Sequence, residues 1–272
     1  MRIDIEGYSP NHIENELSKM ENECIEAIRR IDKSKKFCGE DANLAMNLMA
    51  LLSVRSPEMR ENMRDFKERV AKTVMGLTLA TKERWESEMK QMENSGGPIR
   101  GNITYEEMKN FYERGTYTVS ISREAQIKTE IQLAPEVLTS LGERLWTLYI
   151  TKDSSGEFIT TDRPVTLTYK NPPSISPMHR NSPGFGLPET EVYFPLTKNS
   201  LLVGRWDYGG HWSEEVTTES ADIDYISAVN THMLKNSLRQ IFSRERKIAY
   251  MDFSHNPRWD EELPNLVKSY RI

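Results

Sequence analysis

The segment Leu145-Trp146-Thr147-Leu148-Tyr149-Ile150 marks the point at which the sequence changes from a helical to an extended pattern. Ahead of it, apolar residues recur every three or four positions, the spacing of one face of a helix. From it onward, short apolar and β-branched runs are bounded by Gly, Pro, Asn and Asp, which is typical of strands. Because helices precede strands and another helix follows them, the sequence predicts an α+β fold rather than alternating βαβ units.

The expected architecture is an N-terminal antiparallel helical layer packed on a mostly antiparallel sheet and closed by a C-terminal helix. We expect a single domain over 1–272, with a helical part at 10–115, a sheet and late helix at 116–255 and a tail at 256–272. Pro57 suits the first turn of a helix that begins after Ser56. Thr104 and Glu107 have the spacing of a capping box, and Gly115 suits the end of that helix.

The strands are expected in three groups. The quoted segment and Glu157–Thr160 flank a polar turn and are predicted to form a hairpin. Val165–Tyr169 is a third strand, and Val192–Phe194 and Ser200–Val203 are two more. The last helix is predicted at about residues 220–243.

Composition excludes several classes of protein. The 36 Lys and Arg and 41 Asp and Glu residues give a net charge of −5, which argues against general electrostatic binding to nucleic acid, although a local basic groove remains possible. No apolar run approaches the length of a membrane span, and Met1–Glu6 has no signal-peptide pattern. Two cysteines cannot build a disulfide framework, so a reducing cytoplasm is expected. No motif indicates a cofactor or a metal.

Three polar residues fall where periodicity predicts burial. Arg55 continues the apolar stripe of Leu44, Leu48 and Leu51. Asp162 ends a predicted strand, and Asn230 lies among apolar residues on one face of the last predicted helix. A buried guanidinium needs an anion or several carbonyl acceptors, and a buried amide must be hydrogen-bonded. Each residue therefore either serves a ligand or makes an internal structural contact.

Other chemical signals are weaker. Arg205 and His211 have the Arg-x5-His spacing of some helical ribonucleases, but here the spacing falls in a glycine-containing loop. Gly184-Phe185-Gly186 lacks the strand–helix setting of a phosphate loop. No Gly-x-Ser-x-Gly elbow is present to anchor a hydrolase triad.

The order of several short elements resembles a known family. These are Ile13–Glu21, Val54–Arg60, Phe158-Ile159-Thr160-Thr161-Asp162-Arg163-Pro164-Val165, Phe194-Pro195-Leu196-Thr197 and Val229-Asn230. Over about residues 10–245 this order resembles the bacterial domain of unknown function 4238 family. The resemblance implies an architecture and a set of positions, not a reaction. Members of that family usually begin with a His-containing aromatic segment, which Met1–Pro10 does not contain.

Two functional hypotheses follow. In the first, the chain is a ligand- or partner-binding regulatory module, and Arg55, Asp162, Arg163 and Asn230 form a polar cluster between helices and sheet that binds an anionic ligand or a protein partner. In the second, it is a phosphodiester-acting enzyme, a nuclease-like toxin or phage-defence effector, with Asp162, Arg55 and His211 as catalytic candidates. The oligomeric state is not indicated by the sequence.

Overall fold

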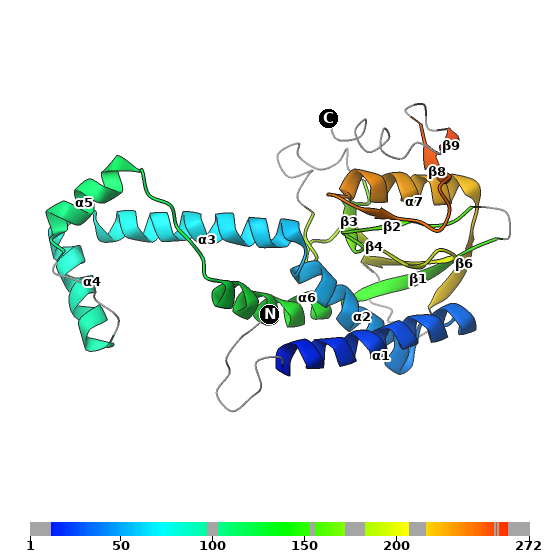
Figure 1. Cartoon of the computed structure of the whole chain (residues 1–272), viewed down its shortest axis with the longest axis horizontal. Coiled ribbons are helices and arrows are strands. Elements are labelled where there is room, and N and C mark those ends of the chain that lie inside the picture. Colours follow the sequence, from blue (N-terminus) through cyan, green and yellow to red (C-terminus); the bar gives the residue numbers. More distant parts are fainter. Residues whose placement is uncertain are drawn as a thin grey trace. The chain divides into compact units, whose positions relative to one another are not determined.

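The computed structural model describes residues 12–96, 103–152, 156–171, 183–206, 216–252, 254 and 256–260 (Figure 1). The chain divides into two compact units: Met1–Ser56 with Lys128–Ile272, and Pro57–Ile127. The prediction of a single domain stays a prediction.

The first unit is built on a five-stranded sheet in the order β3-β4-β5-β1-β6. Its strands are β1 (Arg144–Thr151), β3 (Thr166–Tyr169), β4 (Thr190–Thr197), β5 (Ser200–Trp206) and β6 (Thr217–Ala221). Neighbouring strands are antiparallel except β1 and β6, which are parallel. Two small sheets pair β2 (Thr160–Thr161) with β7 (Ile241–Phe242) and β8 (Ile248–Met251) with β9 (Pro257–Asp260).

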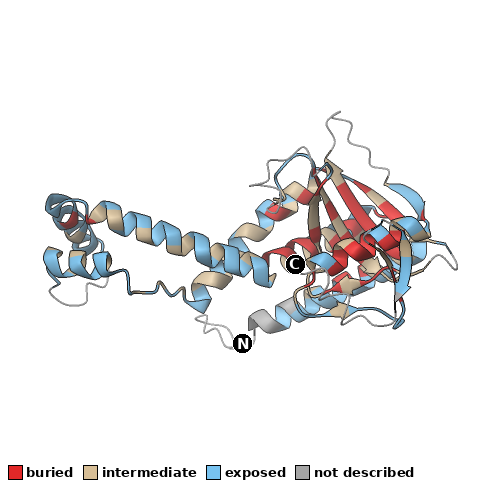
Figure 2. Cartoon of the chain, turned by 90° about the horizontal axis from the view of Figure 1, so that it is seen from above, coloured by how far each residue is buried: buried red, intermediate tan, exposed pale blue. Residues whose placement is uncertain are grey.

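Each face of the five-stranded sheet carries its own apolar core. On one face, Trp146, Leu148 and Leu202 pack with side chains of α1 (His12–Ser34), α2 (Gly39–Val54) and α6 (Arg123–Gly142). On the other, Tyr149, Leu201 and Val203 pack with α7 (Ile223–Asn236) and β8. Adjacent residues of a strand point to opposite faces, which is why Leu148 and Tyr149 enter different cores. Figure 2 shows the buried residues gathered in the sheet and the helices that cover it. The predicted α+β class, with a helical layer on a mostly antiparallel sheet, is confirmed.

The second unit contains α3 (Pro57–Thr78), α4 (Lys82–Asn94) and α5 (Tyr105–Arg114). α3 begins at Pro57 as predicted, and α5 has the predicted capping box and ends at Gly115 in a left-handed conformation (φ 61°). Tyr105 and Tyr112 of α5 donate hydrogen bonds to the carbonyls of Leu79 (3.0 Å) and Lys72 (3.2 Å). Hydroxyl-to-backbone contacts therefore tie α5 to the chain around α3.

Two predictions about elements are wrong. The hairpin of residues 145–150 with Glu157–Thr160 does not form: β1 pairs with β5 and β6, while β2 pairs with β7. β5 is apolar toward both faces and takes the centre of the sheet, where β1 can bury both of its own faces. The late helix is shorter than expected, because 217–221 form β6 and Asp222 caps α7 by accepting the N–H of Tyr225.

Within the described residues, no helix has the length and apolar character needed to cross a membrane.

Candidate functional site

Arg55 is not buried as expected. Its side chain is 38% exposed and forms an ion pair with Glu21, 3.6 Å from nitrogen to oxygen. α2 ends at Val54, so Arg55 occupies the C-cap position and no longer lies on the apolar face of the helix. The expectation that Arg55 projects from the apolar face and is buried is therefore wrong.

Asp162 holds two segments together. Its carboxylate accepts the backbone N–H groups of Leu238 (3.0 Å) and Arg239 (2.8 Å), directly after α7. Its own N–H donates to the carbonyl of Gln240. Next to it, the N–H of Arg163 donates to the hydroxyl of Thr161 (3.1 Å), and burial lowers the pKa of the Arg163 guanidinium. These contacts describe a structural turn.

Asn230 is fully buried, as predicted, and is hydrogen-bonded entirely to backbone. Its carbonyl oxygen accepts the N–H of Ile159, and its amide nitrogen donates to the carbonyls of Glu157 and Ala249, each at 3.0 Å. α7, which carries Asn230, covers one face of the sheet, and α2, which precedes Arg55, covers the other. The structure therefore does not bring Arg55 together with Asn230. His211 lies outside the described residues.

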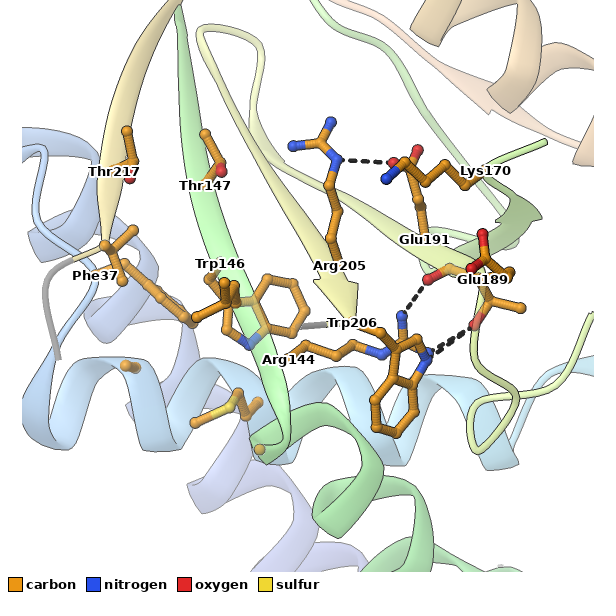
Figure 3. A pocket seen from close by; sticks show the side chains of 16 residues that line it. Phe37, Arg144, Trp146, Thr147, Lys170, Glu189, Glu191, Arg205, Trp206 and Thr217 are labelled. Carbon is orange, nitrogen blue, oxygen red and sulfur yellow. Dashed lines mark hydrogen bonds and ion pairs between the residues drawn. The ribbon is translucent and has the colours of Figure 1, made fainter. Parts of the chain in front are cut away.

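A pocket of about 430 Å³ lies at the end of the sheet where β1, β4 and β6 begin and β5 ends (Figure 3). Its charged lining residues are Arg144, Lys170, Glu189, Glu191 and Arg205. Its aromatic lining residues are Phe37, Trp146 and Trp206, and threonines 147, 190 and 217 also line it. Its volume is in the range of sites for small ligands.

Arg144 is the buried cation of this pocket, with 4% of the residue exposed. Its guanidinium donates to the carbonyls of Thr190 (2.7 Å) and Phe185 (2.7 Å) and stacks on Trp206 at 4.7 Å. Among the described residues no carboxylate forms an ion pair with it, and its Nε has no hydrogen-bond partner. Burial lowers the pKa of Arg144 to about 10, although the charge of Glu191 opposes this shift, so the group stays protonated at neutral pH.

Arg205 and Glu191 form an ion pair across neighbouring strands, 2.7 Å from Nε to Oε1 (Figure 3). Burial opposes the charge of Arg205, but hydrogen bonds to Glu191 and Tyr149 raise its pKa above the ordinary value. The hydroxyl of Tyr193 donates to the second oxygen of Glu191 at 2.7 Å. Glu191 is therefore paired with Arg205, whereas Arg144 forms no ion pair among the described residues and feels the charge of Glu191 only at longer range.

The same pair borders a buried polar network beneath α7. Tyr149 stacks on Tyr225 with their ring centroids 4.4 Å apart, and the ring centroids of Tyr193 and His232 are 5.2 Å apart. The Nε2 of His232 is 2.9 Å from the hydroxyl of Thr166. Burial, together with the charges of Lys235 and Arg163, lowers the pKa of His232 to about 4. This imidazole is neutral at pH 7 and acts as a hydrogen-bonding core residue.

Trp146, which lines the pocket, packs closely on Gly204 of β5. A Cβ on Gly204 would lie 2.8–3.0 Å from three carbons of the Trp146 ring, so only glycine lets the indole lie on β5. The indole nitrogen donates a hydrogen bond to the carbonyl of Leu141 (3.1 Å), and the ring centroids of Trp146 and Phe37 are 5.7 Å apart. The Trp146 ring is therefore held by a hydrogen bond and by close packing on β5 and Phe37.

Arg144 was missed by the sequence reasoning although a signal was present. Arg144, Trp146 and Leu148 alternate along the strand and so share one face. An arginine that shares one strand face with two buried apolar residues is predicted to be buried, by the same reasoning that applies to an arginine on the apolar face of a helix. The long-range partners of Arg144, at residues 185 and 190, could not be read from local pattern.

Within the described residues, no group of three or more His, Cys, Asp or Glu side chains has an arrangement that could hold a metal ion. The pocket instead offers three cations, two carboxylates, hydroxyls and aromatic rings, and the unpaired buried charge of Arg144 suits an organic or inorganic anion.

The fold and the pocket define an α+β protein whose five-stranded sheet is covered on both faces, with a candidate small-molecule site at the end of that sheet. The chain belongs to a family described as "Protein of unknown function (DUF4238)", whose model matches residues 4–247. This confirms the resemblance noted in the sequence. No curated protein and no solved structure matches the chain.

Proposed function

We propose that this chain is a ligand-binding module that takes a small anionic compound into the pocket beside Arg144. The observation that carries the proposal is the buried Arg144 guanidinium, whose partners are carbonyls, a hydroxyl and an indole ring. A buried charge that forms no ion pair is costly, and an anion in the adjoining pocket would relieve that cost beyond the more distant effect of Glu191. Lys170, at the end of β3, lines the same pocket and adds a second positive charge.

The test is anion binding by the whole chain. Binding is measured by the change in tryptophan fluorescence and by the shift in the thermal unfolding temperature. Inorganic phosphate and pyrophosphate should raise the melting temperature, because a ligand that binds only the folded state stabilises it. Arg144→Met should weaken pyrophosphate binding at least tenfold, and Lys170→Ala should weaken it by a smaller factor. Arg55→Gln is the matched control, since it also removes one positive charge but alters only an exposed ion pair.

Two results would contradict the proposal. One is the absence of any binding of phosphate or pyrophosphate by the native chain. The other is an equal loss of affinity in Lys170→Ala and Arg55→Gln, which would indicate a nonspecific effect of net charge. Because Arg144 also holds the loop that precedes β4, Lys170→Ala keeps the test valid if Arg144→Met fails to fold.

The proposal includes a cytoplasmic location. Cys24 is buried and Cys38 exposed, and both are free thiols. An exposed free thiol is compatible with a reducing compartment. Cell fractionation of the native host with a compartment marker tests this part; recovery outside the cytoplasmic fraction would contradict it.

The alternative function, a phosphodiester-acting enzyme, receives less support from the geometry. Both oxygens of Asp162 accept backbone N–H groups, which leaves this carboxylate poorly placed to take a proton from a substrate. Incubation of the chain with RNA or DNA and divalent metals distinguishes the two functions. Cleavage that disappears in a folded Asp162→Ala variant would favour the enzyme over the binding module.

A further inference from the structure

A basic segment, residues 239–247, joins α7 to β8 in a chain whose net charge is −5. It contains one acidic residue, Glu245, and four cationic ones: Arg239, Arg244, Arg246 and Lys247. All four cationic residues are exposed, and none of them forms an ion pair within the part of the chain that the structure describes. They follow the end of α7 at Asn236, so they do not serve the negative end of that helix as residues of its last turn would. Their charge can therefore act on a ligand.

The basic segment is anchored at two points. The carboxylate of Asp162 accepts the N–H of Arg239 at 2.8 Å, and β7 pairs with β2 so that Phe242 lies opposite Thr160. Phe242 is nevertheless 51% exposed. Because the backbone on both sides of it is already held, little ordering is needed when a ligand contacts its ring.

Phe242 borders an apolar groove of about 220 Å³. The other apolar residues that line the groove are Phe158, Ile159, Pro195 and Leu196. Two cations line it as well: Lys198, which forms an ion pair with Glu157, and Arg244 of the basic segment. The volume is below the range of sites that enclose a whole small ligand, so the groove suits one ring of a larger molecule.

The groove is separate from the pocket beside Arg144. The pocket is lined by Thr190 and Glu191 at the start of β4, whereas the groove is lined by residues 195–197 at the end of that strand. Among the described residues the two sites share no lining residue. A ligand of the groove is therefore a second ligand of the chain.

An exposed aromatic ring, an apolar space of limited size and several cations form the combination by which proteins bind single-stranded nucleic acid. Bases stack on the ring, and guanidinium groups bind phosphate through paired hydrogen bonds. An anionic membrane surface would instead favour a continuous apolar face. We propose that this surface binds single-stranded nucleic acid, with one base stacked on Phe242 at the groove and the neighbouring phosphates at the cations of the basic segment.

The first test concerns the aromatic ring and uses fluorescence polarisation of labelled oligo(dT) and oligo(U). The native chain should bind both, and should bind a DNA duplex of the same length less tightly, because paired bases cannot stack on the protein. Phe242→Leu should weaken binding at least fivefold, since leucine fills the apolar space but cannot stack, whereas Phe242→Tyr should bind as the native chain does. The matched control is Phe66→Leu on α3, which changes a phenylalanine that is 54% exposed and should leave binding unchanged.

The second test concerns the charges. The double variant Arg244→Gln, Arg246→Gln should bind oligo(dT) more weakly, and the slope of log affinity against log salt concentration should become shallower by about 1.4, since each cation contributes about 0.7 on a single strand. The double variant Lys33→Gln, Lys36→Gln removes the same charge from exposed residues at the end of α1 and should keep the native slope. Thermal unfolding verifies that every variant is folded.

Four outcomes would overturn the inference. They are the absence of binding to either oligonucleotide, equal affinity for the duplex, native-like binding by Phe242→Leu, and an equal loss of affinity in the two double variants. If anionic vesicles or poly-glutamate bind more tightly than oligo(dT), the surface serves a membrane or an acidic protein instead. Lys170→Ala should bind oligo(dT) as the native chain does, so failure at this surface is distinguishable from failure of the anion-binding function.

Discussion

Asn230 connects three parts of the chain through one side chain. Its amide binds the backbone of residues 157, 159 and 249 and has no exposed surface. Asn230→Ala would leave three buried backbone groups without partners, so the free energy of unfolding should fall by about 3 kcal/mol. Urea denaturation measures this loss. Asn43→Ala, on the exposed face of α2, should change it by less than about 0.5 kcal/mol, and an equal effect of both substitutions would contradict the assignment.

His232 makes stability depend on pH. In the unfolded chain its pKa returns to 6.5, whereas burial holds the folded-state value at about 4. Between these values the unfolded state binds the extra proton, so stability is highest above pH 6.5 and falls toward pH 4, by about 3 kcal/mol in total. Urea unfolding between pH 7.5 and 4.5 measures the slope. His232→Gln should have a shallower slope, and an unchanged slope in this variant would rule out His232 as its source.

The outcomes at single residues show where local pattern is informative. Asn230 lies in the middle of α7, so its helical phase predicts its burial correctly. Arg55 continues the apolar spacing of α2 in the sequence, but the helix ends at Val54, one residue earlier. The end of a helix is set by its capping contacts, which hydrophobic periodicity does not reveal.

At the scale of elements, β1 and β5 must approach closely around Gly204. Because Gly204→Ala places a methyl group against the flat, packed Trp146 ring, it should destabilise the fold by about 1–3 kcal/mol. Chemical denaturation measures the change. Gly142→Ala, where a Cβ meets nothing within 4 Å, is the control and should be nearly neutral. A neutral Gly204→Ala would mean that the indole can move away from β5.

The sequence predicts where the strands lie better than it predicts which strands pair with one another. β3, β4 and β5 lie where apolar and β-branched runs indicate, but the partners of β1 are distant in sequence. A polar turn between two strand-like runs favours a hairpin locally. Pairing between β5 and β6 places β1 inside the sheet, where both of its faces are buried in the two apolar cores, and this outweighs the local preference. The pairing depends on segments 50 to 70 residues further along the chain.

At the scale of the whole molecule, the two units differ in how much they bury. The first has two apolar cores, whereas Leu79 and Trp85 are the buried side chains among the described residues of 57–127. On α3, the apolar residues Phe66, Val70 and Val74 have the spacing of one buried helix face, yet each is 44–55% exposed. Periodicity predicts that α3 is a helix but not what covers it.

This difference predicts unequal hydrogen exchange. Amides of α3, α4 and α5 should exchange faster than those of β1, β4 and β5, because few apolar side chains oppose local opening of the second unit. Trp85→Ala removes one of its two buried side chains and should accelerate exchange over 57–127 while leaving the sheet protected. Leu141→Ala, in the core beneath the sheet, should instead accelerate exchange of β1 and β5. If Trp85→Ala exposes the sheet as well, the two units open as one, and binding at the pocket would then depend on the second unit.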